Sequence, residues 1–165
     1  MWNEGSILGP GEKPEARPHL QEMAEGRQIS GVYWMSPDAF PAGFRAMGLE
    51  FTTSEALIII AAPVLHPTYQ VRLYFRWLSA QKIFTRSMAR IYGQGLDRAL
   101  ADDFIKQQIQ GNVIRYVYPD REPTPAGGER FQVEFTTGRG FSVEAIPSGP
   151  FCADLEVQML ERVGR

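Results

Sequence analysis

Residues 69–77 read YQVRLYFRW, and apolar and polar side chains alternate along this stretch. A period of two residues is typical of a β-strand whose two faces lie in different surroundings. The face predicted to be buried carries Tyr69, Val71, Leu73, Phe75 and Trp77. The face predicted to meet water carries Gln70, Arg72, Tyr74 and Arg76.

Several other segments also predict strands. Residues 31–35 (GVYWM), 44–53 (FRAMGLEFTT) and 112–119 (NVIRYVYP) are short and rich in residues that favour β-structure. Residues 55–62, EALIIIAA, are apolar on both faces, which indicates a strand buried inside a sheet. Residues 151–163, FCADLEVQMLERV, fit an alternating strand and a helix equally well.

Residues 130–146, RFQVEFTTGRGFSVEAI, predict a β-hairpin. If Gly140 takes the left-handed position of a three-residue loop, Phe135 faces Val143 and Val133 faces Ala145 on the core side. The same register places Glu134 opposite Glu144 on the other face. Two like charges in that position are mildly destabilising, and such pairs sometimes serve acid–base or metal chemistry.

Three segments have helical character. Residues 18–26, PHLQEMAEG, predict a short helix with a proline in its first turn and a glycine at its end. Residues 96–110 predict a longer helix that stops at Gly111. Residues 79–92 fit a helix and a strand, and we favour the helix because its apolar side chains recur every four residues.

The fold class predicted from these elements is α+β. We expect one bent antiparallel sheet of about six or seven strands, in an open or barrel-like form, packed by one or two helices. From the sequence we expect no internal repeat. Residues 1–28 are expected to form a flexible N-terminal arm, and residues 29–165 a single domain.

Composition narrows the class of protein. The chain has 165 residues, of which 44% are hydrophobic and 22% charged, as in ordinary soluble globular proteins. Cys152 is the only cysteine, which excludes an intrachain disulfide and favours a reducing compartment. The longest apolar run contains Pro63 and is far shorter than the ~20 residues that cross a bilayer. We therefore expect a cytoplasmic protein that does not bind membranes.

Charge is distributed unevenly along the chain. Residues 56–95 contain no Asp or Glu but five basic residues, which leaves 12 of the 17 basic residues against 19 acidic ones elsewhere. Segregated charge points to a partner. The candidate partner-binding residues are Arg72, Tyr74, Arg76, Lys82, Arg86 and Arg90.

Arginine beside an aromatic ring suits both carboxylates and phosphates. We expect a non-catalytic binding module, such as an inhibitor, an immunity-type protein or an adaptor, that engages an acidic protein partner. The alternative without a partner is a solvent-exposed face whose basic side chains pair with carboxylates of the same chain. Nucleic acid is a further alternative, although a pI near 5.7 is low for a dedicated nucleic-acid-binding protein.

An enzyme that holds a divalent metal through carboxylates is another hypothesis, with Glu134 and Glu144, or Asp102 and Asp103, as its ligands. We do not favour it, and we expect no cofactor and no metal. His19 and His66 read as ordinary residues near the arm and in a turn. Gly95, Leu96 and Asp97 open the predicted helix, where Asp97 reads as its cap. Cys152 is expected to be a small buried hydrophobe.

A small hydrophobic-ligand-binding β-barrel is the remaining alternative. The stretch GVYW followed by several strands is faintly similar to the opening of a calycin barrel, but its spacing, Gly31-x-x-Trp34, is not the Gly-x-Trp pattern of that family. This hypothesis places Trp34, Tyr74 and Tyr116 near the cavity. Aromatic side chains fill a core more often than they line a ligand site.

Overall fold

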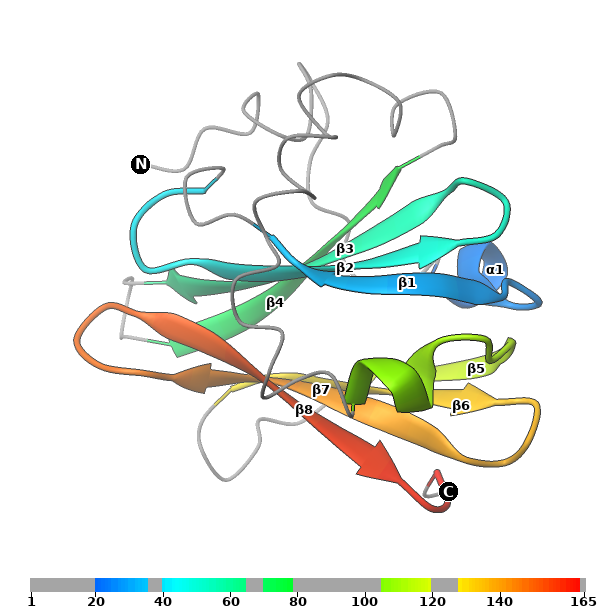
Figure 1. Ribbon diagram of the computed structural model, residues 1–165. Coiled ribbons are helices and arrows are strands. Elements are labelled where there is room, and N and C mark those ends of the chain that lie inside the picture. The colour runs from blue at the N-terminus through cyan, green and yellow to red at the C-terminus, as the bar shows by residue number, and fades with distance from the viewer. Residues whose placement is uncertain (1–19, 36–39, 65–69, 79–104, 120–127, 164–165) are drawn as a thin grey trace.

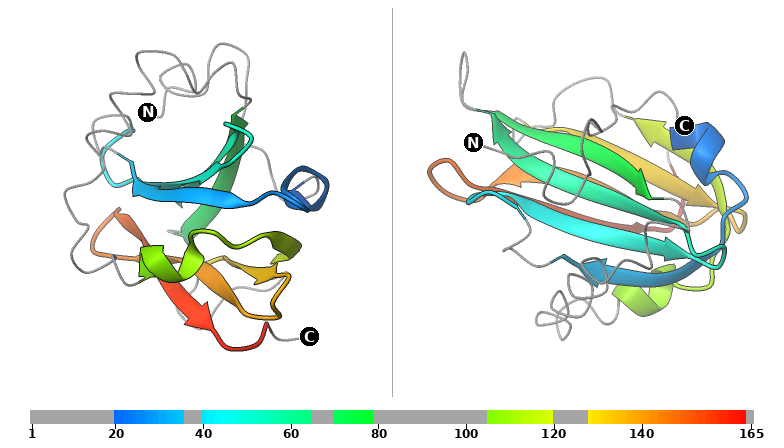
Figure 2. Two further views of the ribbon diagram at one scale, coloured as in Figure 1. Left: turned by 45° about the vertical axis from the view of Figure 1, so that its right-hand side comes forward. Right: turned by 90° about the horizontal axis from the view of Figure 1, so that it is seen from above.

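The computed structural model describes residues 20–35, 40–64, 70–78, 105–119 and 128–163. These residues form two four-stranded antiparallel sheets that stack face to face (Figures 1 and 2). Antiparallel strands with few helices are therefore confirmed. The single bent or barrel-like sheet is wrong, because alternation identifies strands but not which of them pair.

The first sheet has the order β1-β2-β3-β4 and the second β5-β6-β7-β8. The strands of the first sheet are β1 (Ile29–Trp34), β2 (Arg45–Phe51), β3 (Ala56–Val64) and β4 (Gln70–Leu78). Those of the second are β5 (Ile114–Pro119), β6 (Arg130–Phe135), β7 (Gly140–Pro147) and β8 (Ala153–Leu160). Each sheet is a meander, in which every strand pairs with the next one along the chain.

A single apolar core lies between the sheets. The strand predicted over residues 69–77 is confirmed as β4 from Gln70 on, and its residues Val71, Leu73 and Phe75 enter this core, whereas Tyr69 lies outside the described residues. The rings of Phe75 and of Phe131 from the second sheet meet edge to face, with centroids 5.0 Å apart and an interplanar angle of 89°. β3 is buried along most of its length, since Ile58 and Ile60 on its outer face are covered as well. The buried central strand is thus confirmed.

Two short helical segments supply apolar side chains to the same core. Helix α1 (Leu20–Ala24) contributes Leu20 and Ala24, and helical residues 105–109 contribute Ile109. Residues 20–28 thus belong to the folded unit, and the flexible arm stays a prediction for residues 1–19. Among the described residues, no helix is both long and apolar enough to cross a membrane.

Two backbone segments, one after each helix, cross and bind each other reciprocally. Gln28 and Val113 form an isolated antiparallel bridge. Gly26 N–H donates to Ile114 O and Gly111 N–H donates to Ile29 O, both at 2.8 Å. Gly26 and Gly111 both have positive φ, of 81° and 87°, as expected where a glycine ends a helix.

The two sheets and the segments before them also match each other beyond this crossing, which shows that the chain contains an internal repeat. Residues 50–53 and residues 134–137 both read EFTT, and each pair of threonines begins the turn after the second strand of its sheet. Thr52 N–H donates to Gln28 O, and Thr136 N–H donates to Val113 O. The expectation of no repeat is wrong. We call residues 20–78 the first repeat and residues 105–160 the second.

The repeat remains hidden in the sequence because few side chains are shared. Besides the threonines of the two turns, identical residues occupy matched positions at the crossing and in the strands, among them Gly26 and Gly111, Ile29 and Ile114, Val32 and Val117, Tyr33 and Tyr118, Phe51 and Phe135, Ala61 and Ala145, Leu73 and Leu155. Elsewhere the repeats share their pairing register and a bulge in the first strand.

The hairpin register differs from the predicted one. Val133 pairs with Phe141 rather than with Ala145, and the turn is made by residues 136–139 with Gly138 in the left-handed conformation, φ 87°. Gly140 lies in β7, where a Cβ atom would stand only 1.9 Å from Val133 O. The slip is an even number of residues, so the predicted core side chains keep their face. The ambiguous segment 151–163 contains strand β8 and no described helix.

Matched turns allow a direct test of the repeat. Ser54 holds φ 66° at the position where the second repeat has Gly138. Since a side chain in this conformation costs about 1 kcal/mol, Ser54→Gly is expected to raise the free energy of unfolding by about that amount, and Gly138→Ser to lower it. Urea denaturation measures both. Shifts of the same sign would contradict the equivalence of the two turns.

Candidate functional site

The predicted water-facing side of β4 is only partly exposed. The side chain of Arg72 is 52% exposed, whereas Arg76 is only 6% exposed and Tyr74 is half-buried. Burial lowers the pKa of Arg76 below its ordinary value. The expectation of a fully wet face is wrong because Arg76 and Tyr74 lie beside Ile58 and Ile60, on a face of the sheet that is itself covered. Lys82, Arg86 and Arg90 lie outside the described residues.

Arg72 also has a carboxylate neighbour. Its Nε lies 3.3 Å from Glu129 Oε1, and the same oxygen accepts a hydrogen bond from the Leu73 N–H at 3.0 Å. A second ion pair has the charges exchanged between the matched positions: Arg45, at the position of Glu129, has its Nε 3.6 Å from Oδ1 of Asp154, at the position of Arg72. Both pairs join the first sheet to the second. One cation of the predicted surface, Arg72, is therefore paired within the chain, as the alternative without a partner expects.

The two hairpin carboxylates do not face each other. Glu134 pairs with Gly140, and Glu144 pairs with Arg130, so the predicted acidic pair is wrong. Within the described residues, no three His, Cys, Asp or Glu side chains gather in a way that could hold a metal ion. Asp102 and Asp103, the other proposed ligands, lie outside the described residues.

Glu134 instead forms a buried contact with an aromatic hydroxyl. The residue is 8% exposed, and the Tyr118 hydroxyl donates a hydrogen bond of 2.6 Å to its Oε1. Arg115 Nη1 lies 4.0 Å from the other oxygen. In the first repeat, burial and, to a lesser degree, the charge of Glu50 raise the pKa of the matched residue Tyr33.

The remaining candidate residues do not form a common site. Trp34 packs against the core between the sheets, Tyr74 packs on the outer face of the first sheet, and Tyr116 is exposed on the second sheet. They do not line one cavity. Cys152 is half-buried rather than buried, as it lies in the turn before β8. The other residues considered, His19, His66, Gly95, Leu96 and Asp97, lie outside the described residues.

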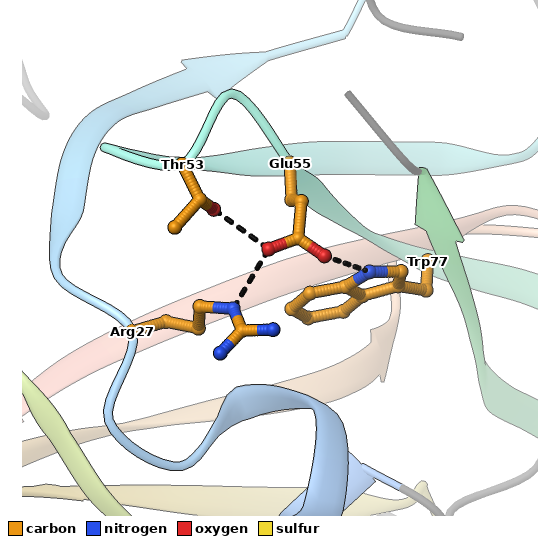
Figure 3. Close-up of polar contacts among 4 residues, drawn as sticks. All are labelled: Arg27, Thr53, Glu55 and Trp77. Carbon is orange, nitrogen blue, oxygen red and sulfur yellow. Dashed lines mark hydrogen bonds and ion pairs between the residues drawn. The ribbon is translucent and has the colours of Figure 1, made fainter. Parts of the chain in front are cut away.

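Two features that the sequence did not indicate lie at the end of the sandwich that carries the two EFTT turns. The first is a polar cluster around Glu55 (Figure 3). Glu55 Oε1 accepts hydrogen bonds from Thr53 Oγ1 at 2.7 Å and from Arg27 Nε at 2.8 Å. Glu55 Oε2 accepts one from Trp77 Nε1 at 3.1 Å. The Trp77 ring also stacks on Phe51, with centroids 5.3 Å apart.

These contacts determine the ionisation of Glu55. Burial alone would raise the pKa of Glu55, but the hydrogen bonds from Thr53, Arg27 and Trp77 and the charge of Arg27 outweigh burial and hold that pKa below its ordinary value. The carboxylate is thus kept charged by partners that reach it from three separate parts of the first repeat.

The second feature is a pocket of about 170 Å³ in the second repeat. Phe135 and Met159 form apolar parts of its wall, and Gln108, Asn112, Thr137, Arg139 and Glu161 provide polar groups. Arg139 Nη2 lies 3.5 Å from Glu161 Oε1, and both side chains are well exposed. We call this site the Arg139 pocket.

A third feature lies at the opposite end of the sandwich, where β4 begins and β7 turns into β8 (Figure 1). Phe151 is 62% exposed and has a positive φ of 59°. A bulky residue in this conformation is a true backbone outlier. The backbone of Phe151 lies close to Gly43, because a Cβ built on Gly43 would stand 2.4 Å from Phe151 O and 3.4 Å from Pro63. Pro63 pairs with Val71 of β4, the residue before Arg72. Arg72, near the start of β4, and Phe151, in the turn before β8, thus lie at the same end of the sandwich (Figure 1), and we call this end the Arg72–Phe151 surface.

Comparison with known proteins adds no assignment, since no family model, curated protein or solved structure matches the chain. The repeated EFTT motif is the sequence signal that could have located the Glu55 cluster and the Arg139 pocket, because aligning its two copies places Glu55 over Arg139.

The Glu55 cluster generates a prediction about pH. Because the pKa of Glu55 is lower in the folded chain than the ~4.3 of an unfolded one, its contribution to stability is complete above that value. It is lost as the pH falls through the folded-state pKa. Glu55→Gln is expected to lower the free energy of unfolding by about 1 kcal/mol near pH 7, and this difference is expected to shrink as the pH falls below ~4.3 and through the lower folded-state pKa of Glu55.

Urea denaturation of both proteins across this pH range measures the difference. Glu25→Gln, at an exposed position after α1, is the matched control and is expected to follow the wild type. A difference between wild type and Glu55→Gln that does not change with pH would contradict a charged Glu55 as the centre of the cluster.

Proposed function

We propose that this protein is a non-catalytic binding module that engages an acidic protein partner through the Arg72–Phe151 surface. The observation that carries the proposal is Phe151, a large apolar side chain that is 62% exposed although its backbone conformation is unfavourable to it. Strained residues persist where the surrounding structure imposes them, and they concentrate at functional sites.

The neighbouring groups support an interface of mixed character. Aromatic side chains and arginine are enriched in protein interfaces, and an exposed ring supplies much apolar area at little conformational cost. Arg72 adds a guanidinium group that is half-exposed and can exchange Glu129 for a carboxylate of the partner. Charge across such an interface would steer the encounter and select the partner more than it would add affinity.

The partner residues proposed from the sequence extend this surface. Tyr74 contributes its half-buried ring, and the buried Arg76 is proposed only as support beneath the surface. Lys82, Arg86 and Arg90 follow β4 in the chain, and their part in partner binding remains a proposal.

Phe151 allows function to be separated from stability. Phe151→Gly is expected to raise the free energy of unfolding by about 1 kcal/mol, because it relieves the unfavourable backbone conformation and removes little buried area. Urea denaturation measures this change. Phe151→Asn is expected to act in the same direction, since asparagine tolerates the left-handed conformation. A loss of stability in both variants would show that Phe151 serves the fold instead of a partner.

Binding is tested by fluorescence anisotropy with three labelled probes of equal length at two salt concentrations. The probes are a peptide of glutamate alone, a glutamate peptide with leucine at every fourth position, and a single-stranded oligonucleotide. The leucine-bearing peptide is expected to bind best, and more tightly at low salt. Phe151→Gly is expected to weaken its binding about tenfold, and Arg72→Gln about fivefold.

Arg162→Gln is the matched control for Arg72→Gln, because Arg162 is exposed and lies beyond β8. This control is expected to bind the peptide as the wild type does. If neither peptide binds at low salt, the acidic protein partner is wrong. Tighter binding of the oligonucleotide would favour nucleic acid instead.

A further inference from the structure

The Arg139 pocket lies where the first repeat carries the Glu55 cluster, and the two can be compared residue by residue. The register of each sheet and the shared turns match Phe51 with Phe135, Thr53 with Thr137, Glu55 with Arg139, Trp77 with Met159, and Arg27 with Asn112. Five positions around the cluster thus correspond to five that line the pocket. The pocket is the second repeat's version of a site that the first repeat fills with its own side chains.

Two substitutions explain why the second site is open. An indole fills the first site, but the second has the narrower, flexible side chain of Met159. A guanidinium reaches across the first site, but Asn112 turns back to donate hydrogen bonds to the carbonyl oxygens of Gln108 and Ile109, at 2.8 and 3.1 Å. The space that Trp77 and Arg27 occupy in the first repeat is left as the pocket.

The pocket has the dimensions and walls for one aromatic ring. An engineered apolar cavity of about 150 Å³ binds benzene, and this pocket measures about 170 Å³. Phe135 corresponds to Phe51, on which the Trp77 ring stacks, but the Phe135 ring is only 1% exposed, so the half-buried Met159 is the more accessible apolar part of the wall. The thioether of Met159 would add a favourable contact between sulfur and ring.

The charge of the site is reversed between the repeats, and this reversal indicates the chemistry of the guest. In the first repeat the carboxylate of Glu55 receives the indole N–H and pairs with Arg27. In the second repeat the matched side chain is the cation Arg139, 58% exposed, whose neighbour Glu161 is 91% exposed and 3.5 Å away. An exposed pair of this length is weak and readily exchanged for another carboxylate.

We infer that the Arg139 pocket binds an aromatic side chain of a partner protein, with an adjacent carboxylate of that partner paired to Arg139. A protein side chain is favoured over a free aromatic acid because Trp77, which fills the matched site, is presented by a strand. This site lies at the opposite end of the sandwich from the Arg72–Phe151 surface, so it stands or falls independently of the proposed function.

The test uses full-length protein with [methyl-¹³C]methionine and four probes: N-acetyl-Asp-Trp-amide, N-acetyl-Asn-Trp-amide, N-acetyl-Asp-Leu-amide and indole-3-acetate. The Met159 methyl signal, assigned from its loss in Met159→Leu, is expected to shift with the Asp-Trp probe because the ring current of the indole acts on it. Binding of the Asn-Trp probe is expected to be about fivefold weaker, and the Asp-Leu probe is expected to leave the signal in place.

Three variants test the pocket by saturation-transfer NMR on the signals of the Asp-Trp probe. Met159→Trp refills the pocket as in the first repeat and is expected to abolish binding. Asn112→Arg fills it from the other side, and keeps the inference testable if the first variant does not fold. Arg139→Gln is expected to weaken binding about fivefold, while its matched control Arg162→Gln leaves it unchanged.

Two results would overturn the inference. An unmoved Met159 signal with the Asp-Trp probe at millimolar concentration would show that the pocket does not take a ring. Equal or tighter binding of indole-3-acetate would show that the guest is a free aromatic acid and not a side chain of a protein.

Discussion

The reciprocal crossing of residues 26–29 and 111–114 is the constraint on which this fold depends. Ile29 N–H donates to Asn112 O, and Ile114 N–H donates to Arg27 O, both at 2.9 Å. Together with the two bonds donated by Gly26 and Gly111, each segment donates two backbone hydrogen bonds to the other and accepts two from it. The crossing fixes the end of each helix and the start of each sheet at the same place, so that the two sheets must face each other across one core.

The same crossing explains how the free edges of the two first strands are protected. Exposed sheet edges are prone to pair with other chains. The side-chain amide of Gln21 in α1 donates a hydrogen bond to Arg115 O and accepts one from Val117 N–H. These two bonds cover the outer edge of β5, the first strand of the other repeat. In turn, Gln110, at the end of the second helical segment, donates to Ser30 O of β1. Each repeat thus completes the other, and the core they share makes them one folded unit.

Local sequence predicts the elements of this protein well and their assembly poorly. Alternation identified β4 and the continuous apolar run identified β3, because these patterns report burial directly. Nothing local distinguishes two four-stranded sheets from one larger sheet, since the division depends on which strands pair. The wrong hairpin register has the same origin: Gly140 and Gly138 are both plausible left-handed residues, and the crowding of Gly140 against Val133 O becomes visible only in three dimensions.

The site that we propose for a guest lies where the two repeats stop being alike. Matched positions in the core keep similar side chains because both halves must fill the same space, so identity there reports packing alone. At Glu55 and Arg139 the backbone is shared but the charge is reversed, and one site is filled while the other is open. The fold does not require this difference, because the first repeat shows that the shared backbone can hold a tryptophan ring, Trp77, in the same site. An open copy beside a closed one is therefore better explained by a guest than by the needs of the fold.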